Sequence, residues 1–410
     1  MRVLVAGAGI GGLTTALALQ RRGIEARVFE SARELAPLGV GINLLPHAMA
    51  ELADLGLLDE IAALGVRTAE LCYFNRHGQL IWREPRGLDA GYPVPQVSVH
   101  RGAFQLALYD VARRRLVAGA LRTGCHLESF ANPSATSVRA VFTDRASGKG
   151  FEEHADLLVA ADGIHSAVRR QMVPDEGLPR WSGNILWRAT SRAKPFLSGR
   201  SMIMAGSRAR KFVAYPISEP GDDGLCAVNW IAELDRSEGA PPPREDWNRR
   251  GAIADFLPAF ADWRFDWLDV PGLIRAADGV FEFPMVDRDP LPRWTDGRAT
   301  LLGDAAHPMY PIGSNGASQA ILDARALADA LAGERDVDFA LERYESARRP
   351  ATAQIVLSNR QHGPECVLDL AEERAPAGFT RVEDVFAPGE LAEIAARYKR
   401  VAGFEPGAPR

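Results

Sequence analysis

The chain has 410 residues, of which 47% are hydrophobic and 25% charged, as is typical of a globular protein with two or three domains. Its formal net charge of −5 comes without a long basic run, which argues against nucleic acid as a partner because phosphate neutralisation requires clustered Lys and Arg. No apolar run approaches the ~20 residues of a spanning helix, and the four cysteines are scattered without metal-ligand spacing, so we expect a cytoplasmic protein without a membrane segment or a metal site.

The first thirty residues carry the most specific local pattern. An apolar strand at 3–6 precedes Gly7, Gly9 and Gly12, a helix is expected over 12–22, and Glu30 closes a second short strand. This is the dinucleotide-binding fingerprint, in which the glycines permit a tight turn, the approach of a pyrophosphate and close packing of the helix on the sheet. Glu30 is placed to accept hydrogen bonds from ribose hydroxyls and would repel a 2′-phosphate, which favours FAD or NAD over NADP. The alternative is a glycine-rich turn that binds no ligand.

The segments that follow mix helices and hairpins. A turn is predicted at 39–43, followed by short helices at 47–55 and 57–64 and by a hairpin formed by 69–75 and 79–83. A long helix is predicted at 102–118, and a second hairpin is formed by 137–143 and 150–154. The apolar run 155–163 then ends in Asp162-Gly163, which indicates a return of the chain to the first sheet, and a short helix is expected at 166–170.

From about 180 to 290 the chain becomes rich in short strands and contains six of the eight Trp residues. Strands are predicted at 184–189, 201–205, 211–216 and 226–230, and a loop at Pro241, Pro242 and Pro243. We interpret this region as a half-buried antiparallel sheet with one aromatic face. A further return to the first sheet is predicted at 299–305, and helices are predicted at 316–332, 341–359 and 388–402.

A second chemical pattern follows the strand at 299–305. Gly303-Asp304 ends this strand as Gly7 follows the first one, so both are expected at the carboxyl edge of the sheet, where ligands of doubly wound folds bind. Asp304 is a candidate acceptor for a ribityl or ribose hydroxyl. The segment 311–316 leads into the next helix, whose N-terminal amides favour an electron-rich atom. The alternative, a helix cap with a glycine hinge, explains the loop but not its position directly after Gly303-Asp304.

Three motifs in this order, Gly7-x-Gly9-x-x-Gly12, Asp162-Gly163 and Gly303-Asp304, with Arg101 between the first two, resemble those of the single-component FAD-dependent aromatic hydroxylases. This is the para-hydroxybenzoate hydroxylase-like family of class A flavoprotein monooxygenases, and the resemblance covers about residues 1–360. Within it, the stretches 38–43, 283–291 and 311–323 look most like the phenazine hydroxylases that act on 5-methylphenazine-1-carboxylate.

The predicted fold class is α/β, with a Rossmann-like domain that is discontinuous in sequence, an inserted β-rich domain and a helical C-terminal tail. We place the FAD-binding domain at 1–70, 97–178 and 290–360, the β-sheet substrate domain at 71–96 and 179–289, and the tail at 361–410.

The resemblance implies which residues bind FAD. Arg101 matches the arginine that contacts the phosphate and ribityl side of the flavin, and Asp162-Gly163 matches a motif with a dual role in FAD and nicotinamide binding. The set carried over comprises Gly7, Gly9, Ile10, Gly11, Gly12, Glu30, Ser31, Gly41, Asn43, Arg101, Asp162, Gly163, Gly303, Asp304, Pro311, Gly313, Ser314, Asn315 and Gly316. Many members read Gly-Gln-Gly-x-Asn in the last loop, whereas this chain reads Gly313-Ser-Asn315-Gly316.

The activity implied is that of a monooxygenase. NADH or NADPH reduces FAD, and dioxygen then forms a flavin C4a-hydroperoxide that hydroxylates an aromatic or heteroaromatic small molecule, phenazine- or hydroxybenzoate-like. No catalytic side chain and no metal are expected, because the cofactor carries the reaction and the protein supplies position, electrostatics and exclusion of water.

Flat or apolar side chains suit such a substrate. The candidates are Leu45, Trp187, Met202, Met204, Tyr215, Trp230, Met285 and Tyr310, although residues of these types at strand spacing are more often core. Arg188 and His47 are alternative partners for a substrate carboxylate, and both are equally compatible with a surface charge. His307 resembles a catalytic base by position, but we expect it to pack near the flavin or to cap a loop.

Other functions fit parts of the same pattern. Oxidative decarboxylation or epoxidation would use the same cofactor chemistry. An NAD-dependent dehydrogenase would explain the first fingerprint but not Gly303-Asp304, and a non-catalytic flavin-binding protein would keep the cofactor site alone. The expected partners are a small aromatic substrate, dioxygen and NAD(P)H, with no nucleic acid or membrane, in a monomer or homodimer.

Overall fold

A computed structural model describes residues 1–37, 40–239 and 249–403 of the chain. Its first sheet has six strands in the order β21-β22-β12-β1-β2-β8. The strands are β1 (Arg2–Ala6), β2 (Glu25–Phe29), β8 (Leu121–Arg122), β12 (Leu157–Ala160), β21 (Thr295–Asp296) and β22 (Ala299–Leu301). All pair in parallel except β21, so the predicted returns of the chain at 155–163 and 299–305 are confirmed. Three motifs distant in sequence therefore follow strands that end at the same edge.

Helices cover this sheet, which explains why its central strands are uniformly apolar. Val3, Leu4 and Val5 of β1 have no exposed surface. Helix α1 (Ile10–Arg21) packs against α4 (Arg101–Arg115) and α7 (Gly316–Gly333), and α7 packs against α8 (Val337–Arg360). The short helices are α2 (Pro46–Asp54), α3 (Leu58–Ala62) and α5 (Ala167–Met172).

The second large sheet has eight strands in the order β17-β20-β13-β16-β15-β14-β5-β6. They are β5 (Glu70–Phe74), β6 (Leu80–Pro85), β13 (Arg180–Ala193), β14 (Ser201–Ser207), β15 (Arg210–Pro216), β16 (Cys226–Asp235), β17 (Arg250–Gly251) and β20 (Val280–Asp287). The pairing is antiparallel apart from β14 with β5, which confirms the inserted sheet. The predicted loop at 241–243 lies outside the described residues, and the predicted domain limits stay a prediction.

The faces of this sheet are covered by different elements. On one face an aromatic cluster packs beneath α6 (Val270–Arg275) and 3₁₀ turns at 253–255 and 257–260, beside the small hairpin β18 (Arg264–Phe265) and β19 (Leu268–Asp269). On the other face lie residues packed against α9 (Cys366–Arg374) and the region of Tyr310. Both faces of this sheet are therefore buried, whereas the sequence predicted a half-buried sheet.

Two three-stranded sheets complete the β-structure. One, in the order β3-β7-β4, contains β3 (Gly41–Leu44), β4 (Gly65–Thr68) and β7 (Gln96–His100). The other contains β9 (Cys125–Ser134), β10 (Ser137–Asp144) and β11 (Gly150–Ala155). The predicted hairpin is β10 with β11, and β9 adds a strand that the sequence analysis did not include.

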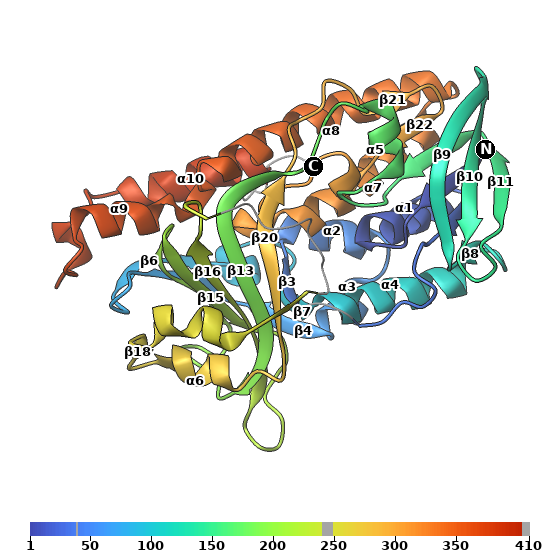
Figure 1. Cartoon of the computed structure of the whole chain (residues 1–410). Helices are drawn as coiled ribbons and strands as arrows, with labels where there is room; N and C mark the ends of the chain where they lie inside the picture. The colour runs from blue at the N-terminus through green and yellow to red at the C-terminus, as the bar shows by residue number, and fades with distance from the viewer. Residues whose placement is uncertain (38–39, 240–248, 404–410) are drawn as a thin grey trace.

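The C-terminal tail is helical, as predicted. It contains α9 and α10 (Glu390–Ala402), which lie at the end of the molecule opposite β9–β11 (Figure 1). Helix α9 was not predicted. It buries Val367, Leu368 and Ala371 against the eight-stranded sheet, so its position depends on a sheet formed far earlier in the chain.

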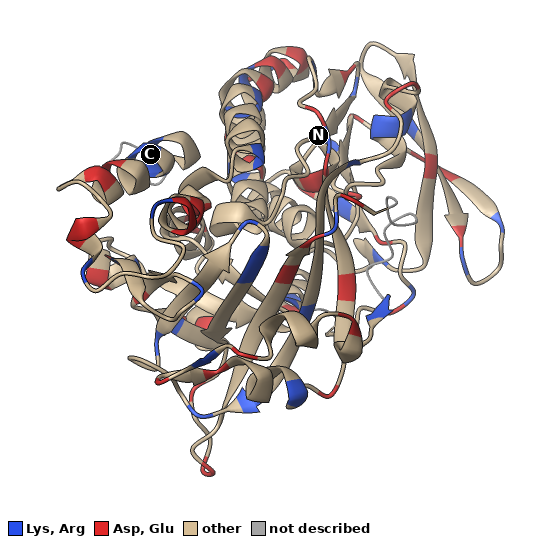
Figure 2. Ribbon diagram, turned by 60° about the vertical axis from the view of Figure 1, so that its left-hand side comes forward, with Lys and Arg blue, Asp and Glu red and all other residues tan. Residues whose placement is uncertain are grey.

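Acidic and basic residues are interspersed over the helices and strands (Figure 2). Within the described ranges, no helix is long and apolar enough to cross a membrane. In the same ranges, no three His, Cys, Asp or Glu residues form a group suited to a metal ion.

Candidate functional site

The turn between β1 and α1 has the geometry that its glycines predict. Gly7 has φ +100°, and a Cβ there would collide with the carbonyl oxygen of Ala161. A Cβ on Gly12 would collide with the carbonyl oxygen of Gly7, whereas a Cβ on Gly9 would meet nothing within 4 Å. Gly9 is the N-cap of α1 and supplies no side-chain cap, so the first amides of the helix stay open to an anion.

Glu30 follows β2 at the same edge and is held by backbone amides. Its Oε2 accepts a hydrogen bond from the N–H of Ala8 at 2.6 Å, and its Oε1 accepts one from Ala32 at 2.7 Å. The neighbouring Ser31 hydroxyl lies 3.1 Å from His126 Nδ1. The carboxylate is thus fixed beside the turn, where a ribose would meet it.

Asp162-Gly163 follows β12 and presents a buried acceptor. Asp162 Oδ2 accepts a hydrogen bond from the N–H of Ala167 at 2.8 Å, while its buried Oδ1 has no hydrogen-bond partner among the described residues. Burial raises the pKa of this carboxyl. Gly163 has φ +78° and open space where a Cβ would project. An orphaned buried oxygen beside open space is what a ligand hydroxyl or amine would satisfy.

Gly303-Asp304 follows β22 and rests on a buried charge network. The N–H of Gly303, at φ +60°, donates to Asp323 Oδ2 at 3.1 Å, and Arg348 Nε donates to Asp323 Oδ1 at 2.7 Å. His307 Nε2 bonds to the same carboxylate. Burial alone would raise the pKa of Asp323, but the charges of His307 and Arg348 hold it at about 2. Asp304 itself is exposed.

His307 belongs to this network rather than to an open site. The side chain is only 3% exposed and its ring lies 5.4 Å from that of Trp294. This buried position gives no support to a catalytic base, and the expectation that His307 packs near the flavin or caps a loop stays a prediction.

The loop at 311–316 has an unusual backbone. Gly313 and Ser314 both have positive φ, +67° and +58°. Pro311 is exposed and Asn315 is fully buried, and Gly316, at the first turn of α7, has open space where a Cβ would project. The N-terminus of α7 is therefore accessible at the same side as Asp304.

Arg101 begins α4, and its side chain is exposed. Its N–H donates to the carbonyl of Val40 at 3.0 Å, next to Gly41. Gly41 lies directly on the eight-stranded sheet: its N–H donates to Asn229 Oδ1 at 2.7 Å, and its carbonyl accepts from Arg188 at 3.0 Å. Strand β3 is thus tied to the second sheet.

Asn43, two residues later, is buried in a polar cluster. Its Oδ1 accepts from Ser98 at 2.6 Å, and its Nδ2 lies 3.5 Å from the sulfur of Met202. Asn43 therefore links β3 to β7 and to the eight-stranded sheet. Its side-chain hydrogen bonds are made to other residues of the chain.

The structure separates the predicted substrate residues into three groups. Met202, Met204, Tyr215, Met285 and Tyr310 share one cluster on the face toward the first domain. Leu45 lies in a small neighbouring cluster with Tyr398 and Ala402.

Trp187 and Trp230 lie instead on the opposite face of the sheet. Trp187 stacks on Phe256 with ring centroids 5.0 Å apart, and Trp230 donates to Ser191 Oγ at 2.8 Å. Residues of opposite parity along a strand point to opposite faces, so these two tryptophans are packed in the interior of the inserted domain. Neither tryptophan is therefore placed to contact a substrate on the face that carries Met202 and Tyr215.

Comparisons with known proteins agree with this geometry. A family model described as an FAD binding domain matches residues 1–247 and 283–359. The chain belongs to the FAD binding domain family. It is 49% identical over 407 residues to the phenazine 1,6-dicarboxylic acid hydroxylase PhzS of Lysobacter antibioticus, in a match that covers 97% of this chain and 96% of that one.

More distant relatives have the same kind of activity. The 3-hydroxybenzoate 6-hydroxylase 1 of Aquipseudomonas alcaligenes is 31% identical over 367 residues, which cover 87% of each chain. A crystal structure of a variant HpxO from Klebsiella pneumoniae in complex with FAD superposes with a TM-score of 0.74 at 25% identity, over 98% of this chain and 94% of that one. The protein is an FAD-dependent aromatic hydroxylase that uses NAD(P)H and dioxygen. The comparisons favour this function over the dehydrogenase and the non-catalytic alternatives.

Several residues that support the site of this monooxygenase were not predicted. Arg169 donates to the carbonyls of Ala305 and Ala306 at 3.0 and 2.7 Å, directly after Asp304. Asp323 lies in the stretch that resembles phenazine hydroxylases, but its role depends on His307 and Arg348, which meet it only in the fold. Tyr398 lies in the amphipathic helix predicted at 388–402, but its contact with Asn315 was not predicted.

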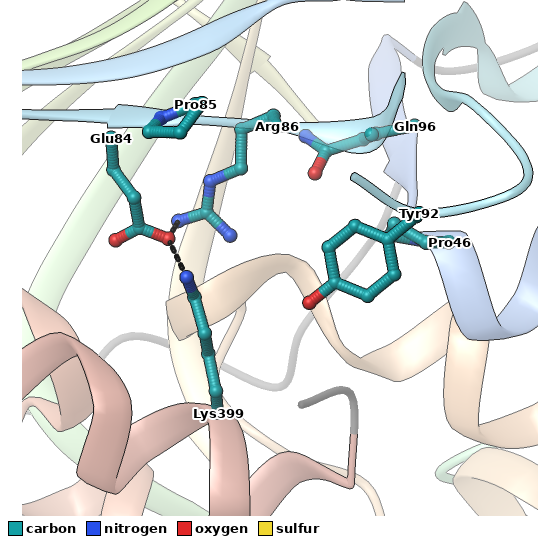
Figure 3. A pocket seen from close by; sticks show the side chains of 8 residues that line it. Pro46, Glu84, Pro85, Arg86, Tyr92, Gln96 and Lys399 are labelled. Atoms are coloured by element: carbon teal, nitrogen blue, oxygen red, sulfur yellow. Dashed lines mark ion pairs between the residues drawn. The ribbon is translucent and has the colours of Figure 1, made fainter. Parts of the chain in front are cut away.

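A small pocket lies beside α10. It is lined by Pro46, Glu84, Pro85, Arg86, Gly87, Tyr92, Gln96 and Lys399. Lys399 reaches from α10 to Glu84 on β6, at 2.8 Å, and Arg86 pairs with the same carboxylate at 3.4 Å (Figure 3). The Lys399–Glu84 ion pair attaches α10 to the eight-stranded sheet.

His47 is buried. Burial, with a smaller contribution from the charge of Arg348, lowers its pKa to about 3. The ring is therefore neutral at physiological pH, which does not fit a role as a cationic anchor for a carboxylate.

Proposed function

We propose that this monooxygenase hydroxylates a planar heteroaromatic carboxylic acid of the phenazine type, and that Arg188 binds the carboxylate. The observation that carries the proposal is a half-buried guanidinium without an acidic partner. Among the described residues, no carboxylate lies within ion-pair distance of Arg188, and its buried Nε has no hydrogen-bond partner.

The surroundings of Arg188 favour an anion. Burial lowers the pKa of Arg188, and the nearby charge of Arg101 lowers it further. A buried guanidinium that has lost its hydration is strongly stabilised when a carboxylate pairs with it. The carboxylate of a substrate would supply that charge and orient the ring system beside it.

The wall around Arg188 suits a flat ring. Leu186 precedes Arg188 on the same face of β13, and Tyr215 lies beside the guanidinium. Burial raises the pKa of Tyr215 to about 12, so its hydroxyl stays protonated at neutral pH. Met202 and Met204 add flexible, polarisable side chains that adapt to aromatic faces. Leu45, Met285 and Tyr310 complete the proposed wall.

The residues of the first domain would hold FAD. We propose that the α1 amides face its pyrophosphate, Glu30 its adenosine ribose and Asp304 its ribityl chain, with the orphaned Oδ1 of Asp162 as a further acceptor. Arg101 and the loop 311–316 would face the flavin. When bound, FAD takes up a hydride from NAD(P)H and activates dioxygen for insertion of one oxygen atom into the ring. The side chains of the chain itself orient the two molecules and exclude water.

The relatives support the substrate class. The name of PhzS gives its substrate as phenazine 1,6-dicarboxylic acid, and the names of other relatives give benzoates that carry hydroxyl or amino groups. All these substrates are aromatic acids. We infer the phenazine type from the higher identity to PhzS, and a hydroxybenzoate is the second candidate.

The test measures substrate-stimulated NADH and NADPH oxidation and hydroxylated product with phenazine-1-carboxylate, phenazine-1,6-dicarboxylate, unsubstituted phenazine and 3-hydroxybenzoate. Arg188→Gln is expected to raise KM for the acids about 10- to 100-fold, as for a lost hydrogen bond to a charged group, and to leave unsubstituted phenazine unaffected. Arg192→Gln is the control, since Arg192 lies on the same strand but pairs with Asp223 at the surface. The proposal fails if no phenazine acid stimulates oxidation, or if Arg188→Gln affects charged and uncharged rings equally.

We further propose a cytoplasmic location and a monomer or homodimer. All four cysteines are free thiols, as a reducing compartment favours. Fractionation of the source cells and light scattering of the purified protein test these two points.

A further inference from the structure

Asn229 of β16 is a fully buried amide whose nitrogen is not used by the fold. Its side chain has no exposed surface. The N–H of Gly41 donates to its Oδ1 at 2.7 Å, which fixes the end of the amide that carries the oxygen. The other end, Nδ2, is buried and has no acceptor in the part of the chain that the structure describes. Because an unpaired buried donor costs free energy, such a group is typically completed by a ligand or by water.

Asn229 lies on the same face of the inserted sheet as the proposed substrate wall. Side chains two positions apart on a strand share a face, and Ile231 belongs to the cluster that contains Tyr215 and Met202. Asn229 is also paired directly with Tyr215 on the neighbouring strand β15. Its side chain therefore projects toward the first domain, away from the aromatic cluster that contains Trp230.

Gly41 holds Asn229 and Arg188 side by side. It begins β3, which is an edge strand of its three-stranded sheet. Its N–H donates to Asn229, and its carbonyl accepts from Arg188 Nη2 at 3.0 Å. A Cβ on Gly41 would lie 2.6 Å from the Cβ of Asn229, so the approach requires glycine. The register of β13 with β16 likewise makes Arg188 and Asn229 diagonal neighbours on one face.

Two buried donors thus remain free at one place. Arg188 Nε, like Asn229 Nδ2, has no hydrogen-bond partner among the described residues. Gly41 already occupies the oxygen of Asn229, so this pair of side chains offers N–H groups alone. It fits a ligand that carries two neighbouring acceptors, one of them anionic, and it disfavours a ligand that lacks the second acceptor.

We infer that Asn229 recognises a ring nitrogen of the substrate beside the carboxylate that Arg188 binds. In a phenazine-1-carboxylate, an unprotonated ring nitrogen stands next to the carboxylate and directs its lone pair to the same side of the ring. Arg188 pairs with the carboxylate while Asn229 Nδ2 donates to this nitrogen, so that the ring system is held at two points. Asn229 is therefore a specificity-determining residue for heteroaromatic acids over their carbocyclic analogues. The inference rests on the proposed role of Arg188.

The experiment measures dissociation constants of the oxidised holoenzyme by calorimetry, without NAD(P)H so that no turnover occurs. The ligands are phenazine-1-carboxylate, anthracene-1-carboxylate, which has a C–H group in place of the ring nitrogen, and unsubstituted phenazine, which lacks the carboxylate. The wild type is expected to bind phenazine-1-carboxylate about tenfold more tightly than anthracene-1-carboxylate, as for one hydrogen bond. The ratio of the two constants within one variant is the readout, because a general loosening of the site affects both acids alike.

Asn229→Asp keeps an acceptor for the Gly41 amide but replaces the free N–H with an oxygen, so the preference for phenazine-1-carboxylate should disappear. Arg188→Gln should weaken both acids equally and keep the preference. Asn132→Asp on β9 is the matched control, because the exposed Asn132 also accepts from a backbone amide, that of Arg298 at 2.9 Å. This control should keep the preference of the wild type.

The outcomes separate this inference from the proposed function. An unchanged preference in Asn229→Asp, or equal affinities of the wild type for the two acids, overturns the role of Asn229. If Asn229→Asp does not fold, Asn229→Leu takes its place, and the ratio in the wild type decides independently of either variant. If phenazine binds to the wild type as tightly as phenazine-1-carboxylate, the proposed role of Arg188 fails and the inference fails with it. A clear requirement for the carboxylate beside equal affinities for the two acids refutes only the role of Asn229.

Discussion

Asp323→Asn tests the charge network beneath Gly303-Asp304. The Asp323 side chain has no exposed surface and accepts hydrogen bonds from the Gly303 amide at 3.1 Å and from Arg348 Nε at 2.7 Å, in addition to its bond with His307. An asparagine fits the same space but removes the negative charge. Arg348, whose side chain is 11% exposed, then loses its buried counter-charge.

The expected loss of stability can be worked out from the partners of Asp323. Despite the opposing effect of burial, His307 and Arg348 lower the pKa of Asp323 from 3.8 to about 2, which corresponds to about 2 kcal/mol at ~1.4 kcal/mol per pKa unit. Removal of one partner from a buried ion pair costs about 3–5 kcal/mol. We therefore expect Asp323→Asn to lower the free energy of unfolding by about 3 kcal/mol at pH 7.

The pH dependence follows from the direction of the shift. Because the pKa is lower in the folded state, the contribution of Asp323 is fully present above pH 3.8 and is lost as the pH falls toward about 2. The difference between wild type and Asp323→Asn should be constant from pH 8 to pH 5, on the order of the value at pH 7, and should narrow below about pH 4.

Urea unfolding of the apoprotein, followed by tryptophan fluorescence at several pH values, measures this difference. Asp329→Asn is the control: Asp329 lies on the same helix α7 and pairs with Arg325 and with Arg22, each at 2.8 Å, but its side chain is 37% exposed. An exposed pair contributes about 0–1 kcal/mol. The reasoning is refuted if the two variants unfold at the same urea concentration at pH 7, or if the difference for Asp323→Asn widens on acidification.

Two further predictions concern the glycine turn and the cofactor. Gly12→Ala should lower the free energy of unfolding of the apoprotein by about 1–3 kcal/mol, as for an overpacked contact, because its methyl group collides with the Gly7 carbonyl. Gly9→Ala should leave that free energy unchanged but weaken FAD binding about tenfold in a fluorescence titration, as a loss of about 1.4 kcal/mol would. Asp304→Ala and Glu30→Ala should each lower the FAD content of the purified protein, measured by the ratio of absorbance at 450 to 280 nm, and full FAD occupancy in either variant would contradict the role proposed for that residue.

The sequence predicted the elements whose geometry is local. The requirement for glycine at positions 7 and 12 follows from the tight turn between a strand and a helix, and the structure shows the collision that any side chain would cause. The apolar runs before Asp162 and Gly303 were interpreted as strands because parallel strands buried on both faces are continuously apolar. Both pair as expected.

The sequence did not distinguish side chains that face the proposed substrate site from side chains packed in the core of the inserted sheet. Trp187, Trp230, Met202 and Tyr215 were equivalent candidates by residue type, but a shift of one position along a strand moves a side chain to the other face. Their assignment to two clusters depends on the register of β13 to β16. Arg188 was one of two candidate anchors, and only the fold shows that it has no acidic partner in the described part of the chain.

The sequence was sufficient to predict a dinucleotide-binding fold, a phosphate-binding turn at residues 7–12 and the family resemblance, because these features depend on backbone geometry within short contiguous segments. Only the tertiary structure shows which side chains support the predicted site. Asp323 acquires its charge partners, and Tyr398 acquires Asn315, only when helices separated by tens of residues pack together. Such contacts depend on sheet register and helix docking, and therefore leave no periodic pattern in the sequence.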